Sequence, residues 1–226
     1  MEDQLPARYR RRFEAEHANR QAVWRVLIDA WFSRYLDVSA ALDLGCGWGA
    51  FVNQIDVPTR YGIDLNPEAK RHVAPDVELI SQPASQRWPL PDGSLDLVFT
   101  SNFLEHLASR EDIAATLSEA FRCLRRDGRM VCLGPNIRYA HGAYWDFFDH
   151  LIPLTERSLV EALELTGFEP ELVVARFLPF TTVGKRAPRP VLMRAYLRFP
   201  PAWRVLGRQF LVVVRKPATD PEGPGE

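Results

Sequence analysis

The sequence predicts an α/β fold in which a doubly wound, mostly parallel sheet lies between layers of helices. Short apolar runs typical of buried strands alternate with helical patterns along most of the chain. The first of these runs passes directly into a glycine-rich turn at residues 45–49, which in such folds joins a strand to a helix. A length of 226 residues with 46% hydrophobic content suits a single domain with one sizeable core, which we place at residues 1–218.

The individual elements can be placed in chain order. Apolar residues at helical spacing between positions 9 and 35 predict one or two leading helices, and we expect residues 8–36 to form an N-terminal helical cap over the active site. About seven strands are expected, near residues 40–44, 60–64, 77–81, 95–100, 129–134, 171–178 and 209–215. Helical patterns separate most of them, at residues 50–54, 67–73, 110–124 and 156–166.

The glycine-rich turn predicts a nucleotide-binding site. Gly45, Gly47 and Gly49 let the backbone turn tightly and approach a ligand where a Cβ atom would clash. Asp64 ends the next apolar run, where a carboxylate can accept both hydroxyls of a ribose. The glycines alone fit a nicotinamide enzyme as well as a methyl-transferring one. Asp43 favours the second, because it would repel a pyrophosphate but accept hydrogen bonds from an ammonium group.

Two segments, Leu-Asp-Leu-Gly-Cys-Gly-Trp-Gly at 42–49 and Gly-Ile-Asp-Leu-Asn-Pro at 62–67, resemble the class I S-adenosylmethionine-dependent methyltransferases. The resemblance extends over about residues 8–216. It implies a Rossmann-like fold whose last strand, 209–215, lies antiparallel between its neighbours. It also implies S-adenosyl-L-methionine as the cofactor. The residues that it places at the cofactor are Asp43, Gly45, Cys46, Gly47, Trp48, Gly49, Asp64, Leu65, Ser101 and Asn102.

Three further blocks agree with this resemblance, and one position departs from it. The blocks are residues 88–107, 124–131 and 134–155. The last is similar to a bacterial subgroup often found beside enzymes of glycan and polysaccharide biosynthesis. Where the family often has an acidic residue for the adenine amino group, this chain has Pro-Ala-Ser-Gln at 83–86. We therefore assign the adenine contact to Ser85, Gln86 or the backbone.

Two histidines are candidates for a general base that would take a proton from a hydroxyl acceptor. His150 is the first, because it follows the fifth strand at the edge where ligands bind, and Asp146 or Asp149 could orient its ring. The alternative is a structural histidine that bonds a loop carbonyl. His106 is the second candidate, and its alternative role is to cap or pair within the short helix that it opens.

Residues after the fifth strand are candidates for the acceptor site. Asn136, Arg138 and Tyr139 could hold the acceptor, and Arg138 would suit a phosphate or carboxylate. Tyr144 and Trp145 could form a pocket wall, although aromatic clusters equally often belong to the core.

Charge is distributed unevenly along the chain. The net charge is −1, yet residues 172–219 contain no Asp or Glu and ten Lys or Arg. This stretch includes a proline-rich insertion at 183–207. It is either a solvated basic face on an acidic body, or a contact for an anionic partner such as a phosphorylated substrate or a membrane surface. No nucleic-acid recognition motif is present, and we expect no nucleic-acid partner.

Cysteine usage and the termini indicate the compartment. The three cysteines show neither metal-ligand nor disulfide spacing, so we expect no metal and a reducing cytoplasm. The N-terminus lacks a signal-peptide pattern, and residues 219–226 are expected to be a disordered tail. The expected location is cytoplasmic, with peripheral contact to the inner face of the membrane.

Together these observations predict a methyltransferase that acts on the oxygen of a sugar, a glycan precursor or a small hydroxylated metabolite. Two alternatives stay open at this point. One is a non-catalytic S-adenosylmethionine-binding protein, and the other is an NAD-dependent oxidoreductase. The residues place the cofactor site more closely than they identify the acceptor.

Overall fold

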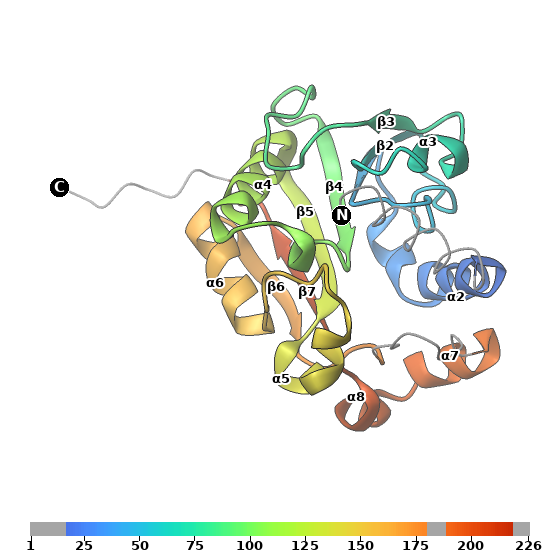
Figure 1. The fold of residues 1–226 in the computed structure, drawn as a ribbon. Coiled ribbons are helices and arrows are strands. Elements are labelled where there is room, and N and C mark those ends of the chain that lie inside the picture. The colour runs from blue at the N-terminus through green and yellow to red at the C-terminus, as the bar shows by residue number, and fades with distance from the viewer. Residues whose placement is uncertain (1–16, 180–188, 219–226) are drawn as a thin grey trace.

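A computed structural model describes residues 17–179 and 189–218 of the chain. Within these residues seven strands form one sheet, in the order β3-β2-β1-β4-β5-β7-β6 (Figure 1). The strands are β1 (Ala40–Leu44), β2 (Thr59–Ile63), β3 (Glu78–Ile80), β4 (Leu95–Ser101), β5 (Leu124–Pro135), β6 (Glu169–Val174) and β7 (Gln209–Arg215). Neighbouring strands from β3 to β5 are parallel, whereas β7 lies antiparallel between β5 and β6. The predicted fold class, including its antiparallel last strand, is confirmed.

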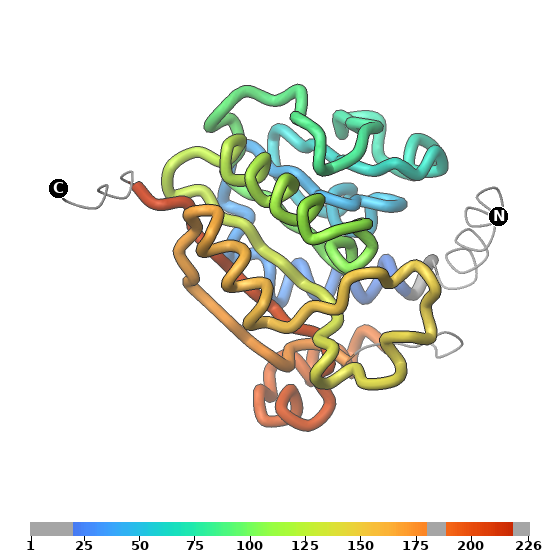
Figure 2. Tube along the Cα trace, turned by 60° about the vertical axis from the view of Figure 1, so that its left-hand side comes forward, coloured from blue at the N-terminus to red at the C-terminus, as the bar shows by residue number. Residues whose placement is uncertain are grey.

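Helices cover both faces of this sheet. They are α2 (His17–Ala30), α3 (Ala69–His72), α4 (Arg110–Cys123), α5 (Ile137–Ala140), α6 (Glu156–Thr166), α7 (Pro190–Leu197) and α8 (Pro200–Leu206). Three short 3₁₀ helices accompany them, η1 (Phe32–Tyr35), η2 (Leu104–His106) and η3 (His141–Asp146). The helices α4 and α6 lie side by side along one face, as Figure 2 shows. The helix α2 covers the opposite face and contacts α7.

Alternation along the strands explains why both faces are covered. In β4, Val98 belongs to the core with α4 and α6, whereas its neighbours Leu97 and Phe99 belong to the core with α2. Strands that are apolar on both sides must be packed on both sides, as is usual for parallel sheets. The described part of the predicted N-terminal cap is therefore a layer on the sheet, since Val26 and Leu27 of α2 are buried there.

Local capping signals place the ends of the longer helices. The Ser109 hydroxyl accepts from the Asp112 N–H and starts α4. Thr155 and Ser158 form a reciprocal capping box at the start of α6, and Gly167 ends it with a φ of 104°. These two helices match their predicted ranges closely. The chain passes from α4 directly into β5, which starts earlier than predicted because Arg125, Arg126 and Asp127 are exposed and give no strand pattern.

Two other predictions differ from the structure. Residues 50–54, predicted as a helix, form hydrogen-bonded turns. The residue before this segment, Gly49, has a φ of 71°, which is not a helical value. The five residues that follow it are too few to form a stable helix of their own. The sixth strand ends at Val174 instead of residue 178, because Ala175 turns its carbonyl to the Asn136 side chain. Residues 8–16 of the predicted cap, 183–188 of the predicted insertion and the predicted tail 219–226 lie outside the described residues.

Among the described residues, no helix combines the length and the apolar character needed to cross a lipid bilayer. The described part of the insertion, residues 189–207, forms α7 and α8. Both helices begin with proline, which has the backbone angle of a first helical turn and no N–H to leave unpaired.

Candidate cofactor and catalytic site

The turn after β1 has a backbone that requires glycine. Gly45, Gly47 and Gly49 have φ values of 73°, 53° and 71°. A Cβ atom on Gly45 would lie 2.4 Å from the side chain of Phe103, which follows β4. The Gly45 and Cys46 N–H groups both donate to the Ile63 carbonyl at the end of β2, at 2.8 and 3.1 Å. The turn is thus held against the next strand, at the edge of the sheet where the parallel strands end.

Asp43 is a buried carboxylate beneath this turn. Its side chain is 4% exposed, and its Oδ2 accepts a long bond of 3.3 Å from the Val52 N–H. Burial raises the pKa of Asp43 to about 7; the Val52 bond opposes this effect and the nearby charge of Asp64 adds to it. A carboxylate with so little compensation fits a cationic ligand group, such as an ammonium.

Asp64 is held in place by two backbone groups. Its Oδ2 accepts from the Gly47 N–H and its Oδ1 accepts from the Asn66 N–H, both at 2.7 Å. Each oxygen keeps a second lone pair, so the carboxylate can still accept two hydroxyls of a ribose. Burial raises the pKa of Asp64, while these bonds and the charge of His106 lower it. The neighbouring Leu65 is 65% exposed and free to pack against an adenine ring.

The side chains of Cys46 and Trp48 pack against neighbouring parts of the fold. Trp48 is buried and stacks on His72 of α3, with ring centroids 3.9 Å apart and planes 11° apart. Cys46 packs with Val52 and Val77, and burial raises the pKa of its thiol. The assignment of Cys46 and Trp48 to the cofactor site stays a prediction, which their backbone can still fulfil. What they contribute to the turn is their backbone.

The remaining predicted cofactor residues lie on the loops that follow β3 and β4. Ser85 is partly buried and Gln86 is exposed, within a turn closed by a bond from the Gln86 N–H to the Pro83 carbonyl. At the end of β4, the Asn102 side chain donates to the Ser101 hydroxyl at 2.9 Å. Asn102 has a φ of 51°, an uncommon value that places strain at this edge.

Three titratable side chains meet beside these loops. Glu105 and His106 of η2 and His150, from the loop after η3, have potential ligand atoms within 4.8 Å of one another. The rings of His106 and His150 are 4.9 Å apart in an edge-on arrangement. The two histidines were separate candidates in the sequence, and the structure brings them together. Such a group can store or move a proton.

His106 has a defined tautomer. Its Nδ1 lies 2.8 Å from the Asp149 carbonyl oxygen, and this oxygen can only accept, so Nδ1 carries the hydrogen. In the neutral ring, Nε2 therefore carries the lone pair. Asp149 Oδ2 also lies 3.5 Å from the same Nδ1. Asp149 thus orients His106, whereas it was one of two aspartates, with Asp146, predicted as able to orient His150.

His150 is enclosed by aromatic rings. It is 7% exposed, stacks on Phe147 at 4.7 Å and contacts the Tyr144 ring at 4.6 Å. The side chain of His106, by comparison, is 28% exposed. An acceptor can therefore reach His106 more easily than His150.

Glu105 is a residue that the sequence analysis did not assign to the site. It is 2% exposed, and its Oε1 has no hydrogen-bond partner among the described residues. Burial raises its pKa to about 7, and the charge of His106 opposes this rise. Its carbonyl accepts from the N–H groups of Leu151 and Ile152, joining the loops that follow β4 and β5. The sequence signal that could have identified Glu105 is its position directly before His106.

The predicted acceptor residues divide into exposed and structural ones. Asn136 is fully buried, caps α5 and donates to Glu156 at 2.6 Å, and Arg138 pairs with the same Glu156 at 2.7 Å. Tyr144 is also fully buried, and its hydroxyl donates to the Ile152 carbonyl at 2.6 Å. Asn136 and Tyr144 therefore support the loop through these bonds, and their contact with an acceptor stays a prediction.

Three of the predicted acceptor residues stay accessible. Arg138 keeps 41% of its side chain exposed beside Glu156. Tyr139 is partly buried, and the guanidinium carbon of Arg176 lies 4.8 Å above the centre of the Tyr139 ring. Trp145 is 59% exposed and packs edge-on against Tyr144 at 4.9 Å. These side chains border the loop that carries His150.

Comparison with known proteins agrees with this geometry. Residues 42–132, which run from β1 through the turn to β5, match the methyltransferase domain family. This region is therefore similar to a methyltransferase domain. Together with the glycine turn and the two aspartates, the similarity to these proteins indicates S-adenosylmethionine as the cofactor.

A curated relative supports the same cofactor. A probable S-adenosylmethionine-dependent methyltransferase of Mycolicibacterium smegmatis is 35% identical over 137 residues, which are 58% of this chain and 52% of that protein. The chain thus spans about half the length of the curated relative it matches.

Solved structures share the fold of this chain. An S-adenosylmethionine-dependent methyltransferase from Archaeoglobus fulgidus has a TM-score of 0.64 at 19% identity, over 87% of this chain and 94% of that one. One from Mesorhizobium loti has a TM-score of 0.61 at 19% identity, over 84% and 97%. The [4+2]-cyclase SpnF scores 0.58 at 17% identity, over 88% and 81%. Because this last protein is a cyclase, the fold by itself does not specify the reaction.

Proposed function

We propose that the whole chain transfers a methyl group to a hydroxyl oxygen of a sugar, a glycan precursor or a similar small hydroxylated metabolite. S-adenosylmethionine, when bound, supplies a methyl group that is already activated by its sulfonium. The task left to the protein is to hold the acceptor oxygen in line and to take its proton. The observation that carries the proposal is the lone pair of His106 Nε2, fixed by the bond from Nδ1 to Asp149.

The position of His106 suits a general base. It belongs to η2, directly after β4, and its charge lowers the pKa of Asp64, the residue expected at the ribose. It therefore lies beside the cofactor site on the edge where the acceptor must approach. We assign the proton transfer to His106 Nε2, and we place His150 and Glu105 behind it as positioning residues.

Glu105 stabilises the protonated base in this proposal. When the acceptor hydroxyl gives its proton to His106 Nε2, the imidazole ring becomes cationic. A carboxylate close by favours that cation, and the buried position of Glu105 strengthens the interaction. His150 packs against the His106 ring and limits its movement.

Accessible aromatic and basic side chains support the class of acceptor. Trp145 and Phe148, 59% and 85% exposed, offer apolar ring faces of the kind that the flat side of a sugar can cover. Arg138 offers a cation for a phosphate, such as that of a nucleotide sugar. The segment 134–155, which resembles a glycan-associated subgroup, contains all three residues.

We propose a cytoplasmic location for this activity. Cys46, Cys123 and Cys132 are buried free thiols in the structure, which suits a reducing compartment. Oxidation would require these thiols to become exposed first.

An acceptor screen tests the reaction. Labelled S-adenosylmethionine is offered with nucleotide sugars, lipid-linked glycans and small phenols, and the product is examined for a methyl ether. Transfer to a hydroxyl supports the proposal. Binding of S-adenosylhomocysteine without turnover on any acceptor supports the non-catalytic alternative, and binding of NAD in its place supports an oxidoreductase.

The His106→Gln variant tests the base. We expect turnover to fall by about 10²–10⁴-fold, with cofactor affinity nearly unchanged, because the proton acceptor is lost and the ribose site is not. The matched control is His141→Asn, which removes an exposed histidine at a positive φ that Asn tolerates. If His150→Gln abolishes turnover and His106→Gln does not, the base is His150.

A further inference from the structure

The helices α7 and α8 expose a cluster of large apolar side chains. Val191 and Leu192 on α7, Phe199 between the helices, and Val205 and Leu206 on α8 are each more than half exposed. We call this set the apolar face. Large apolar side chains gathered within two neighbouring short helices usually mark a contact surface.

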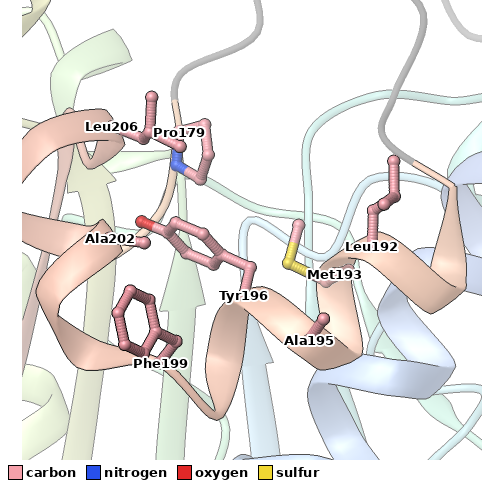
Figure 3. Close-up of a pocket in the computed structure, with 8 residues that line it drawn as sticks. All are labelled: Pro179, Leu192, Met193, Ala195, Tyr196, Phe199, Ala202 and Leu206. Carbon is pink, nitrogen blue, oxygen red and sulfur yellow. The ribbon is translucent and has the colours of Figure 1, made fainter.

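A groove runs through the apolar face. It has a volume of about 450 Å³, and eight residues of α7, α8 and the chain before them line it (Figure 3). The Tyr196 hydroxyl, the polar side-chain group in this lining, already donates to the Phe177 carbonyl at 2.6 Å. The groove therefore offers hydrocarbon contacts, which suit an apolar chain better than a polar substrate.

Packing beneath the helices keeps this face in place. Met193 and Leu197 of α7 and Trp203 of α8 are buried in the core that includes α2. The Trp203 indole donates to the Tyr196 carbonyl at 2.9 Å and so links the two helices. The apolar side chains are thus exposed on helices that are anchored underneath, and their exposure does not require an opening of the fold.

Arginines alternate with the residues of the apolar face along the chain. Arg194, Arg198 and Arg204 are exposed, and none forms an ion pair with a carboxylate in the part of the chain that the structure describes. Residues 172–219 contain no acidic residue that could neutralise them. The excess of positive charge is local, because the whole chain has a net charge of −1.

We propose that α7 and α8 dock on an anionic lipid bilayer, with the apolar face in the acyl region and the arginines at the lipid phosphates. The combination of exposed apolar side chains with unneutralised arginines is the pattern of an interfacial helix. A two-fold contact with a second copy would bring arginines toward arginines. A nucleic acid would use the arginines but not Val191, Leu192 or Phe199.

Vesicle co-sedimentation tests the proposal. The full chain is mixed with phosphatidylcholine vesicles, with and without phosphatidylglycerol, at low and high salt. We expect sedimentation with the anionic vesicles at low salt and release at high salt, because salt screens the attraction between arginines and phosphates. Binding to neither vesicle at low salt would overturn the proposal.

Matched variants separate the two parts of the surface. Arg194→Glu/Arg198→Glu should lower the bound fraction at least tenfold, and Leu192→Ser/Phe199→Ser should lower it at every salt concentration. The control, Arg110→Glu/Arg157→Glu, reverses two exposed charges on α4 and α6 and should bind as the parent does. Thermal unfolding confirms that each variant is folded. Equal binding of the α7 variant and the control would overturn the proposal, as would a concentration-dependent dimer abolished by Leu192→Ser/Phe199→Ser.

Discussion

At the scale of single residues, the site depends on carboxylates that the fold buries. Asp43 and Glu105 are nearly inaccessible, and burial raises the pKa of each to about 7. Asp64 is better compensated, since two backbone N–H groups donate to it. The three carboxylates therefore differ in how far hydrogen bonds and nearby charges compensate their burial. Asp43 lacks a cation, Glu105 lies beside a histidine, and Asp64 has spare lone pairs.

Replacement of Asp64 tests the ribose site. Asp64→Ala should weaken S-adenosylhomocysteine binding by about 1–3 kcal/mol, the usual cost of losing hydrogen bonds to a charged group. Isothermal titration calorimetry measures the change, and Asp56→Ala, an exposed aspartate before β2, serves as the control. An unchanged affinity in a folded variant would remove Asp64 from the cofactor site.

The pKa of Asp43 predicts a dependence of stability on pH. The folded-state pKa of about 7 lies above that of an unfolded aspartate, near 3.9, so the folded protein binds more protons between these values. The free energy of unfolding of the ligand-free protein should then fall as the pH rises from about 4 to about 7, and level off above.

Denaturant titrations across this range measure the effect. Glu105 acts in the same direction and the same window, so Asp43→Asn should reduce the slope and Asp43→Asn/Glu105→Gln should flatten it further. A slope unchanged in both variants would show that these carboxyls titrate normally.

At the scale of elements, the helices were predictable where capping residues mark their ends. Ser109 and Thr155 are N-caps at which both the pattern and the structure start a helix. The strand β5 was predicted too short, because Arg125, Arg126 and Asp127 near its start are charged and exposed and show no strand pattern. The glycine turn was predicted as a cofactor site, but the helix predicted directly after it, at residues 50–54, is a series of turns in the structure. There, positive φ values outweighed the apolar spacing.

The cap of α6 can be tested on its own. Thr155→Ala should lower the free energy of unfolding by about 1 kcal/mol, because the Ser158 N–H loses its side-chain acceptor. Urea denaturation measures the loss. Ser118→Ala is the control, since this exposed hydroxyl bonds within α4 and caps nothing. A loss no larger than that of the control would mean that the capping box adds little stability.

At the scale of the whole molecule, the cofactor half of the site was predictable and the catalytic half was less so. Asp43, the glycines and Asp64 lie within one short stretch of the sequence, residues 43–64, so their motif shows directly. Glu105 and His150 come from loops that follow different strands, and their contact exists only because β4 and β5 end at the same edge. The burial of Asn136 and Tyr144 likewise depends on packing across distant segments, which no local pattern records.

The strand order of the sheet also affects how the chain can fold during synthesis. The strand β6 joins the sheet only through β7, and β7 is the last of the seven strands to be made. As the chain emerges from the ribosome, β1 to β5 can pair in order, while β6 must wait for residues 209–215. Until then the edge of β5 is exposed to other chains. Synthesis thus has a late period in which the nascent chain carries its cofactor motif but is open to aggregation, and the final strand ends that period.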